Sequence, residues 1–406
     1  MTIIKAKFIM LCDENFTILK DKAVAFEDRI LKTGEASELI KEFPQADFID
    51  AKDAIIAPAF INPHVHLEFS ANKTSLVYGD FLEWLSSVIA SRSELSKEAN
   101  QALIAKTIKE IQRSGVGTIG AVSSFGSDFE PCVSSSARII YFNEILGTNE
   151  QILETNKQNF ISRFKKSKEA QNELFIPAIS VHSPYSTHPK LANFALQIAR
   201  DENLIVSTHL MESNHEKDWL TNGSGGFKEW LSKFNKSATP FYDVNSFISL
   251  FSGIKTLFTH CVYLNDFSKF EREFHSVTHC AFSNRLLSKK TLNLQNLIDE
   301  KIPFNIGTDG LSSNISLNFF DELRANLLIH SEFNPQNLAQ ILILASTSNA
   351  AKALGLNLGE IATGKIADIA VYEGFGEIKE SELALMLLLH TKNCQSLYIN
   401  GKICEL

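Results

Sequence analysis

The chain has 406 residues, of which 44% are hydrophobic and 21% are charged, and its formal net charge is −8. This length suits one α/β barrel with a small accessory domain, and because lysine and arginine form no dense cluster we expect no nucleic-acid partner. The apolar runs fall well short of the roughly 18 residues of a membrane span, and the run before Asp13 is too short for a secretory signal, so we expect a cytoplasmic protein without membrane association.

The two ends of the chain have a strand-like pattern. Residues 1–56 are rich in alternating and β-branched residues, and the pattern returns after the barrel in ADIAVYEG and SLYINGKIC. Asp13-Glu14-Asn15 and Asn400-Gly401 supply hairpin turn chemistry. We therefore expect residues 1–56 and 358–406 to form one small β-sandwich domain.

Between the two ends, short apolar runs recur and most are followed by a stretch with helical spacing. Residues 96–115 are expected to form a helix that closes at Gly115, and residues 187–203 a second one that opens with Thr187 and Pro189. The eight strand candidates are IIAPAFINPH, VGTIGAVSS, RIIYFNEILG, FIPAISVHSP, LIVSTHLMES, IKTLFTHCVY, SVTHCAFSN and PFNIGTDG. Eight β-α units predict an α/β fold, a (β/α)8 TIM barrel over residues 57–357.

The six cysteines are scattered without a C-x-x-C pair. This pattern argues against a zinc ribbon, a redox dithiol and a disulfide scaffold, and it fits a reducing cytoplasm. It also excludes the nucleobase deaminases that hold zinc with a P-C-x-x-C motif, because Pro131-Cys132 is followed by VSSSA.

Polar residues gather at the C-terminal ends of the predicted strands, where catalytic groups of a barrel lie. Six of the eleven histidines fall at these ends, which scattering alone would rarely produce. In chain order the residues are His64, His66, His182, His209, Glu212, His260, His279, Ser283, Asn284 and Asp309. On its own, the His-x-His pair of the first strand indicates only that both rings share one face of that strand.

A metal site follows from the residue types. A catalytic divalent ion takes neutral imidazoles and a carboxylate and keeps a position for water. The candidates are His64, His66, His209 and Asp309, which offer three nitrogens and one oxygen from strands one, five and eight. The fourth strand ends in ISVHSPY, without the lysine that would bridge a second ion, so we predict one divalent metal ion, Zn²⁺ or Fe²⁺.

As a set, these motifs resemble the amidohydrolase superfamily, in its branch of metal-dependent deaminases and chlorohydrolases. The resemblance covers nearly the whole chain and rests on NPHVH, STHLMES, FTHCVYL, THCAFSN, GTDGLSSN and GLNLGEIATGKIADIAVYEG. It implies that His64, His66, His209 and Asp309 hold the metal. It further implies that His260 hydrogen-bonds the attacking water, that Glu212 shuttles protons, and that Asp309 also accepts a proton from the water.

The substrate contacts are less defined by the sequence. The resemblance gives His182 a substrate contact, with a structural role as the alternative, and it gives His279 a supporting position behind the site. Arg138 lies at the wrong end of its strand for the arginine clamp of S-adenosylhomocysteine deaminases. The candidates for the remaining ligand contacts are Glu68, Glu144, Asn284, Arg285 as the partner of a carboxylate, and Trp84 in the loop 78–92.

The segments NPHVHLEFS, FLEWLSSVI and YFNEILG resemble aminodeoxyfutalosine deaminases of the futalosine route to menaquinone. The substrate in that group is an adenine nucleoside with a carboxyphenyl tail. We therefore expect hydrolytic deamination of a 6-aminopurine nucleoside, aminodeoxyfutalosine first. The alternatives are deamination of methylthioadenosine, S-adenosylhomocysteine or adenosine, or hydrolysis of another amino- or chloro-heterocycle. A non-catalytic scaffold is disfavoured because every ligand position is filled. A homodimer is left open.

Overall fold

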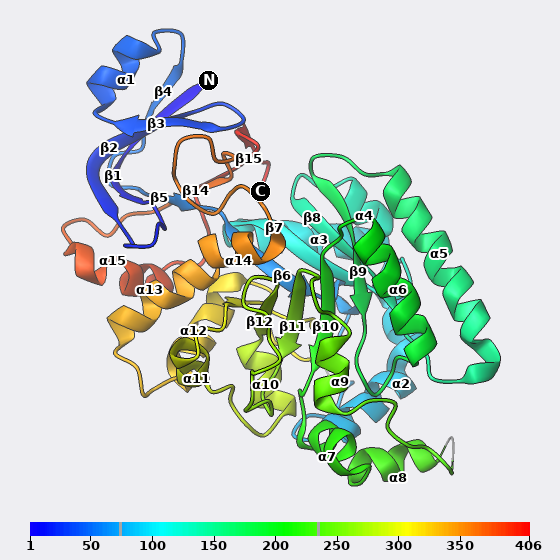
Figure 1. The fold of residues 1–406 in the computed structure, drawn as a ribbon. Coiled ribbons are helices and arrows are strands. Elements are labelled where there is room, and N and C mark those ends of the chain that lie inside the picture. Colours follow the sequence, from blue (N-terminus) through cyan, green and yellow to red (C-terminus); the bar gives the residue numbers. More distant parts are fainter. Residues whose placement is uncertain (73–74, 234–235) are drawn as a thin grey trace.

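The structure is a computed structural model that describes residues 1–72, 75–233 and 236–406. Its larger part is a barrel of eight strands that are joined in parallel and in chain order (Figure 1). The strands are β6 (Phe60–Val65), β7 (Val116–Ser123), β8 (Arg138–Ile145), β9 (Phe175–Val181), β10 (Val206–Leu210), β11 (Thr256–His260), β12 (His275–His279) and β13 (Phe304–Ile306). All eight predicted barrel strands, and the TIM-barrel fold itself, are confirmed.

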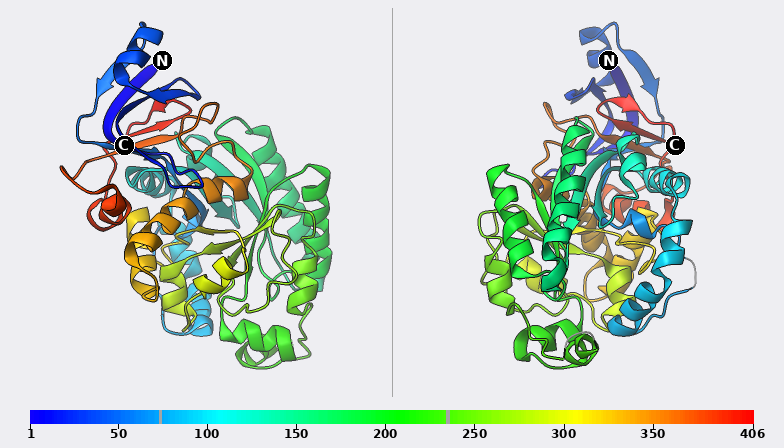
Figure 2. Two further views of the ribbon diagram at one scale, coloured as in Figure 1. Left: turned by 60° about the vertical axis from the view of Figure 1, so that its left-hand side comes forward. Right: turned by 90° about the vertical axis from the view of Figure 1, so that its right-hand side faces the viewer.

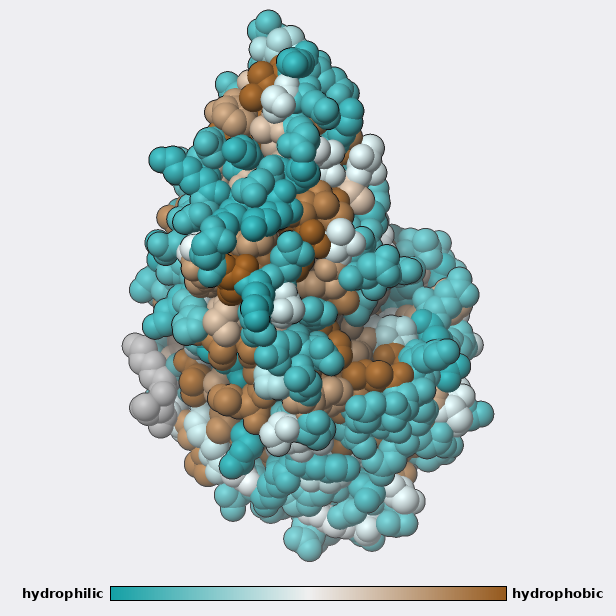
Figure 3. Space-filling model, turned by 90° about the vertical axis from the view of Figure 1, so that its left-hand side faces the viewer, coloured by the Kyte–Doolittle hydropathy of each residue, from teal (hydrophilic) through white to brown (hydrophobic). Residues whose placement is uncertain are grey.

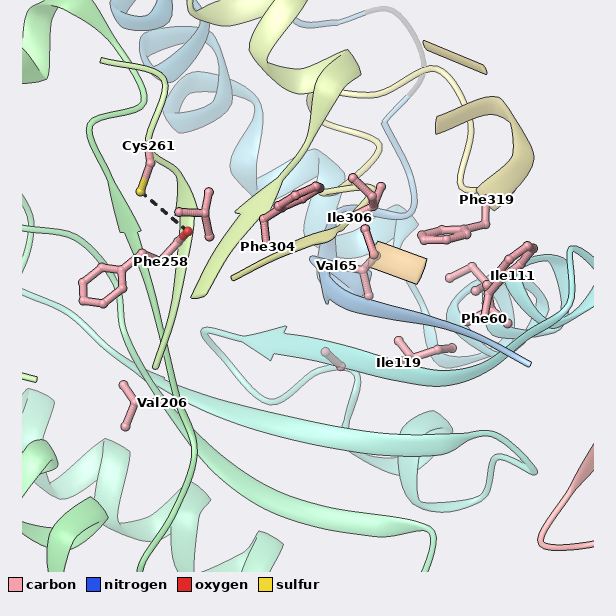
Figure 4. Close-up of a cluster of buried hydrophobic side chains, with 14 of the residues drawn as sticks. Phe60, Val65, Ile111, Ile119, Val206, Phe258, Cys261, Phe304, Ile306 and Phe319 are labelled. Atoms are coloured by element: carbon pink, nitrogen blue, oxygen red, sulfur yellow. Dashed lines mark hydrogen bonds between the residues drawn. The ribbon is translucent and has the colours of Figure 1, made fainter. Parts of the chain in front are cut away.

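The barrel closes where the last strand meets the first. Figure 4 shows Val65 of β6 next to Ile306 of β13, and the two strands are in contact. The Asp309 N–H donates to the His64 carbonyl at 3.1 Å. A Cβ on Gly307 would lie 3.0 Å from the Cβ of His64, so this approach requires a residue without a side chain.

The first predicted strand proves to be two. Its first half, β5 (Ile55–Pro58), pairs with strands of the second sheet, and its second half is β6 of the barrel. Ala59 lies between them, and its N–H donates to the carbonyl of Asp368 at 2.9 Å. Both halves are fully buried, so the sequence shows one uninterrupted apolar run, and the point where the chain passes from one sheet to the other cannot be recognised from it.

Helices surround the barrel (Figures 1 and 2). They are α2 (Phe81–Glu98), α3 (Gln101–Arg113), α4 (Phe129–Val133), α5 (Leu153–Glu169), α6 (Pro189–Asp201), α7 (Asn214–Asn222), α8 (Gly226–Ser232), α9 (Val244–Ser249), α10 (Ala281–Leu287), α11 (Leu294–Asp299), α12 (Phe319–Ile329), α13 (Pro335–Ala345) and α14 (Ser348–Leu354), with short 3₁₀ turns η1 (Leu67–Phe69) and η2 (Glu150–Ile152). Of these helices, α2 and α8 lie at the end of the barrel away from the β domain (Figures 1 and 2). Across the described residues, no helix combines the length and apolar character needed to cross a membrane.

Two local predictions are corrected around α2. The segment 78–92, expected to be a loop, forms most of this helix, because the side chain of Asp80 caps the N–H groups of Leu82 and Glu83. The helix expected from residue 96 instead begins at Gln101, where Asn100 caps the Leu103 N–H.

The second sheet joins both ends of the chain, as predicted. It contains β1 (Thr2–Met10), β2 (Ile18–Phe26), β3 (Ile30–Gly34), β4 (Asp47–Asp50), β5, β14 (Ile369–Tyr372), β15 (Ser396–Ile399) and β16 (Lys402–Ile403), and the helix α1 (Ala36–Glu42) lies beside β1 to β3. At its centre, β5 pairs with β1 on one side and β14 on the other. The C-terminal helix α15 (Glu380–His390) instead packs against α12 and α13 of the barrel.

The two parts share an apolar core. Phe60 of β6 has its ring centroid 5.5 Å from that of Phe319 on α12 (Figure 4). The centroid of the Tyr372 ring on β14 lies 6.0 Å from that of Phe60. Burial of such large side chains is the main favourable contribution to joining the two parts. Outside this core, hydrophilic residues cover most of the face that carries the β domain, with hydrophobic side chains between them (Figure 3).

A buried ion pair also links the barrel to the β domain. Arg138, at the start of β8, donates through Nε and Nη2 to the two carboxylate oxygens of Asp368, both at 3.1 Å. Both side chains are at most 3% exposed, and Asp368 also accepts from the Asn400 N–H at 2.8 Å. Arg138 therefore lies at the N-terminal end of the barrel, facing the β domain.

We predict that Asp368→Ala lowers the free energy of unfolding by about 3–5 kcal/mol, because it leaves the Arg138 guanidinium buried without a counter-charge. Urea denaturation would measure the change. Glu110→Ala, which removes an exposed partner of Lys106, is the matched control and should cost less than about 1 kcal/mol. Equal effects of the two substitutions would mean that the buried ion pair does not stabilise the protein.

Candidate active site

Four side chains from three barrel strands meet at the C-terminal mouth. The two Nε2 atoms of His66 and His209 lie 3.2 Å apart. Asp309 Oδ1 is 3.6 Å from His66 Nε2 and 3.8 Å from His64 Nε2. The structure thus brings together the four residues that the sequence proposed as ligands.

The chemistry of this group fits a divalent metal ion. Burial lowers the pKa of His64 and of His209 well below the ordinary histidine value, so both rings are neutral and offer lone pairs. The Nε2 of His64 is buried and has no hydrogen-bond partner among the described residues. Three imidazoles beside a carboxylate are a donor set that Zn²⁺ or Fe²⁺ takes in proteins.

The neighbouring hydrogen bonds orient these ligands. His209 Nδ1 donates to the His182 carbonyl at 3.0 Å, which turns its Nε2 toward the site. The carboxylate of Asp309 accepts from the Gly310 N–H and from Ser313 Oγ, both at 2.8 Å. Asp309 itself has a φ of 59°, a left-handed conformation that costs energy in a residue with a side chain.

Glu212 and His260 lie at the edge of this cluster. Glu212 Oε2 is 3.6 Å from His260 Nε2, and both residues are buried. Burial, with the charge of Asp309 nearby, raises the pKa of Glu212 well above its ordinary value. A carboxyl group that holds its proton near neutrality can donate that proton to a bound substrate.

A chain of hydrogen bonds fixes the ring of His260. Its Nδ1 donates to Asn284 Oδ1 at 2.8 Å, and the Asn284 amide donates to His279 Nδ1 at 3.1 Å. His279 Nε2 lies 3.0 Å from His330 Nε2. His260 Nε2 therefore remains an acceptor that faces Glu212 and has no hydrogen-bond partner within the described part of the chain. Asn284 therefore lies behind His260 and not in the cavity, where the sequence had placed it as a substrate contact. No motif in the sequence predicted the contact between His330 and His279.

A cavity of about 340 Å³ opens from the cluster. Its polar end is formed by His66, His209, His260, Asp309 and Glu212. Most of its remaining wall is apolar or aromatic and includes Phe69, Phe81, Trp84, Leu85, Val88, Ile89, Phe125, Leu146, Tyr185, Trp230 and Leu231. A long, mainly apolar cavity with polar groups at one end is typical of a small-molecule site.

Three of the predicted substrate contacts line this cavity: Trp84, Glu144 and His182. The Trp84 indole N–H donates to the Ser312 carbonyl at 2.8 Å, which fixes the ring against the loop after β13. Glu144, at the end of β8, accepts from Ser180 Oγ at 3.2 Å.

Glu68 and Arg285 are not among the residues that line the cavity. The Glu68 carboxylate accepts from the N–H groups of Ser124, Phe125 and Ser127, so it holds the loop after β7. Arg285 is exposed on α10, where the residue before it is turned inward and buried. The prediction that these two side chains contact a ligand finds no support in this placement.

The model of the amidohydrolase family matches residues 55–404. The chain belongs to the amidohydrolase family. Similar amidohydrolases include an aminodeoxyfutalosine deaminase of Nitratiruptor, 40% identical over 95% of this chain and 96% of the relative, and an adenosine deaminase of Helicobacter pylori, 36% identical over 98% of each chain. The structure also resembles the crystal structure of Helicobacter pylori aminofutalosine deaminase in complex with methylthio-coformycin, with a TM-score of 0.94 and 35% identity over 100% of both chains.

We predict that the purified amidohydrolase contains one divalent ion per chain, and that Asp309→Ala loses most of it, because a neutral methyl group replaces the anionic donor. Elemental analysis by mass spectrometry would measure the stoichiometry. His390→Ala, which alters an exposed histidine on α15, should keep the metal. Two ions per chain in the wild type would contradict the single-metal prediction.

We also predict that Asn284→Leu lowers the kcat of this amidohydrolase by about 10- to 100-fold at unchanged metal content, because His260 loses the partner that fixes its ring. Asn284→Asp keeps an acceptor for His260 Nδ1 and should recover part of the rate. Steady-state kinetics with metal analysis of each variant would test this, and a wild-type rate in Asn284→Leu would argue against the positioning role.

Proposed function

We propose that the chain hydrolyses the 6-amino group of an adenine nucleoside, and that this nucleoside is aminodeoxyfutalosine. The observation that carries the proposal is the position of Glu212 and His260 beside the metal-type donor set, at the closed end of an apolar cavity. The name of the Nitratiruptor relative and the nucleoside-type inhibitor bound by the Helicobacter structure support the same substrate class.

In this proposal His64, His66, His209 and Asp309 hold one divalent ion, either Zn²⁺ or Fe²⁺. Such an ion supplies water activation when bound, since it can lower the pKa of the bound water to about 7. The buried surroundings of these four residues strengthen their electrostatic interactions, because little water competes at the closed end of the barrel.

Glu212 and His260 carry the proton movements. Glu212 donates a proton to a ring nitrogen of the purine as water adds to the neighbouring carbon, which loses its aromatic character. His260 accepts a hydrogen bond from the attacking water through its bare Nε2 and so orients it. Asp309 takes one proton from this water. Glu212, now deprotonated, takes the remaining hydroxyl proton and passes it to the amine, which leaves as ammonia and gives a 6-oxopurine. The proton on Asp309 then restores the protonated Glu212.

The cavity supports a nucleoside with a long apolar tail. Its wall continues from Trp84 along α2 to Ile89, well beyond the polar groups that would surround the purine. Adenosine lacks a group to fill this extension, whereas a 5′-aryl substituent would bury apolar surface there. Methylthioadenosine, S-adenosylhomocysteine and adenosine remain the alternatives, together with other amino- or chloro-heterocycles.

The proposal assigns the enzyme to the futalosine route to menaquinone, in the cytoplasm. All six cysteines are free, and five of them are buried, which supports a reducing compartment. A homodimer is compatible with the proposal.

We predict that the metal-loaded enzyme converts aminodeoxyfutalosine to futalosine with a higher kcat/KM than methylthioadenosine or adenosine. The absorbance change of adenine-to-hypoxanthine conversion and the release of ammonia would both report the reaction. Glu212→Gln should lower kcat by about 10²- to 10⁴-fold while it retains the metal, because the amide cannot shuttle a proton. An enzyme that deaminates guanine or a triazine but leaves aminodeoxyfutalosine unchanged would overturn the assignment.

A further inference from the structure

One face of helix α2 forms a wall of the cavity. The lining residues of this helix are Phe81, Trp84, Leu85, Val88, Ile89 and Arg92. They follow one another at spacings of three, one, three, one and three residues, which places them on a single helical stripe. The stripe is apolar or aromatic until its last member, which is a cation.

The two ends of this stripe lie at different distances from the metal-type cluster. Trp84 is tied to the carbonyl of Ser312, three residues after Asp309, so this part of α2 is anchored beside the cluster. Arg92 follows Trp84 by eight residues, which corresponds to about 12 Å along the helix axis. The cation therefore lies toward the tail end of the cavity, away from the reacting groups.

Arg92 has an aromatic neighbour, and the carboxylates of Glu68 and Glu144 act on its charge without forming an ion pair with it. Its guanidinium carbon lies 4.0 Å from the centre of the Phe125 ring. Within residues 1–72, 75–233 and 236–406, its side chain makes no hydrogen bond and no ion pair. No other lysine or arginine is among the described residues that line the cavity.

The Phe125 ring stands on a loop whose backbone is held in place. The Glu68 carboxylate accepts from three consecutive or nearly consecutive N–H groups of this loop, including that of Phe125 at 3.0 Å. The Phe125 side chain is itself 50% exposed. A ligand would meet an aromatic ring whose backbone is already held in place, which reduces the entropy lost on association.

We propose that Arg92 and Phe125 form a subsite for an aryl carboxylate at the tail of the substrate. A guanidinium can donate two parallel hydrogen bonds to a carboxylate while its plane contacts an aromatic ring. The carboxylates of Glu68 and Glu144 lie near enough to act on the charge of Arg92, but among the described residues that line the cavity Arg92 is the one cation that can receive an anionic tail. The subsite therefore fixes the orientation of an anionic nucleoside, with its tail at Arg92 and its purine at Glu212. This inference rests on the proposed function and names its specificity determinant.

The test compares three substrates: aminodeoxyfutalosine, its methyl ester, and methylthioadenosine, whose tail is uncharged. Arg92→Gln should raise the KM for aminodeoxyfutalosine by about 10- to 100-fold with kcat nearly unchanged, and it should leave the other two substrates as in the wild type. Arg92→Lys should give a KM for aminodeoxyfutalosine between those of the wild type and Arg92→Gln, because an ammonium group keeps the charge but not the paired hydrogen bonds. Lys97→Gln removes an exposed cation of the same helix outside the cavity and serves as the matched control.

Two results would overturn the subsite. An equal loss on all three substrates in Arg92→Gln would mean that Arg92 supports only the structure of α2. An unchanged KM for aminodeoxyfutalosine would mean that its carboxylate binds elsewhere. Failure of the proposed function is distinguishable, because it would appear in the wild-type enzyme as turnover of uncharged nucleosides without turnover of aminodeoxyfutalosine.

Discussion

The site depends on closure of the barrel between β13 and β6. Two of the proposed ligands come from the first strand and one from the segment after the last strand, so nothing in the local sequence brings them together. The hydrogen bond from the Asp309 N–H to the His64 carbonyl and the close approach of Gly307 join these two edges. Only then does the Asp309 carboxylate come within 3.8 Å of two imidazoles. Imidazoles and a carboxylate that converge in this way form a donor set whose chemistry fits a divalent cation.

The gathering of the four proposed ligands was predictable from the sequence because strand ends in a barrel all point to one mouth. Once His209 or Asp309 is assigned to the end of its strand, its position in the site follows. The same logic located Glu212 and His260, whose spacing from the strands is fixed. The TIM barrel and the β domain made from both chain ends follow from the order of the apolar runs along the sequence. This order stays correct even where the first or last residue of a predicted strand is wrong.

Features that depend on a single turn of backbone were not predictable. Glu68 has the right spacing to follow His66 on an extended strand, but the chain turns at η1 and its carboxylate binds N–H groups instead. Arg285 directly follows Ser283 and Asn284, which are buried, and the rotation of about 100° per residue along α10 turns Arg285 to the surface. Arg92 was overlooked because its segment was expected to be a loop, whereas Asp80 caps a helix there whose register turns Arg92 to the cavity.

Helix α2 also limits how the cavity can change in evolution. In a rigid helix that is anchored at Trp84, the backbone fixes the distance between the side chains at the two ends of the stripe, whatever rotamers they adopt. A shorter ligand could not use both ends of the stripe by a small side-chain movement. Adjusting the cavity to a tail of another length would require a change of about 1.5 Å per inserted residue, with a rotation of about 100° that turns every later side chain away from the ligand. Substrate length is therefore expected to diverge among relatives in steps of whole helical turns, while substitutions along the stripe alter only the polarity of the tail that is accepted.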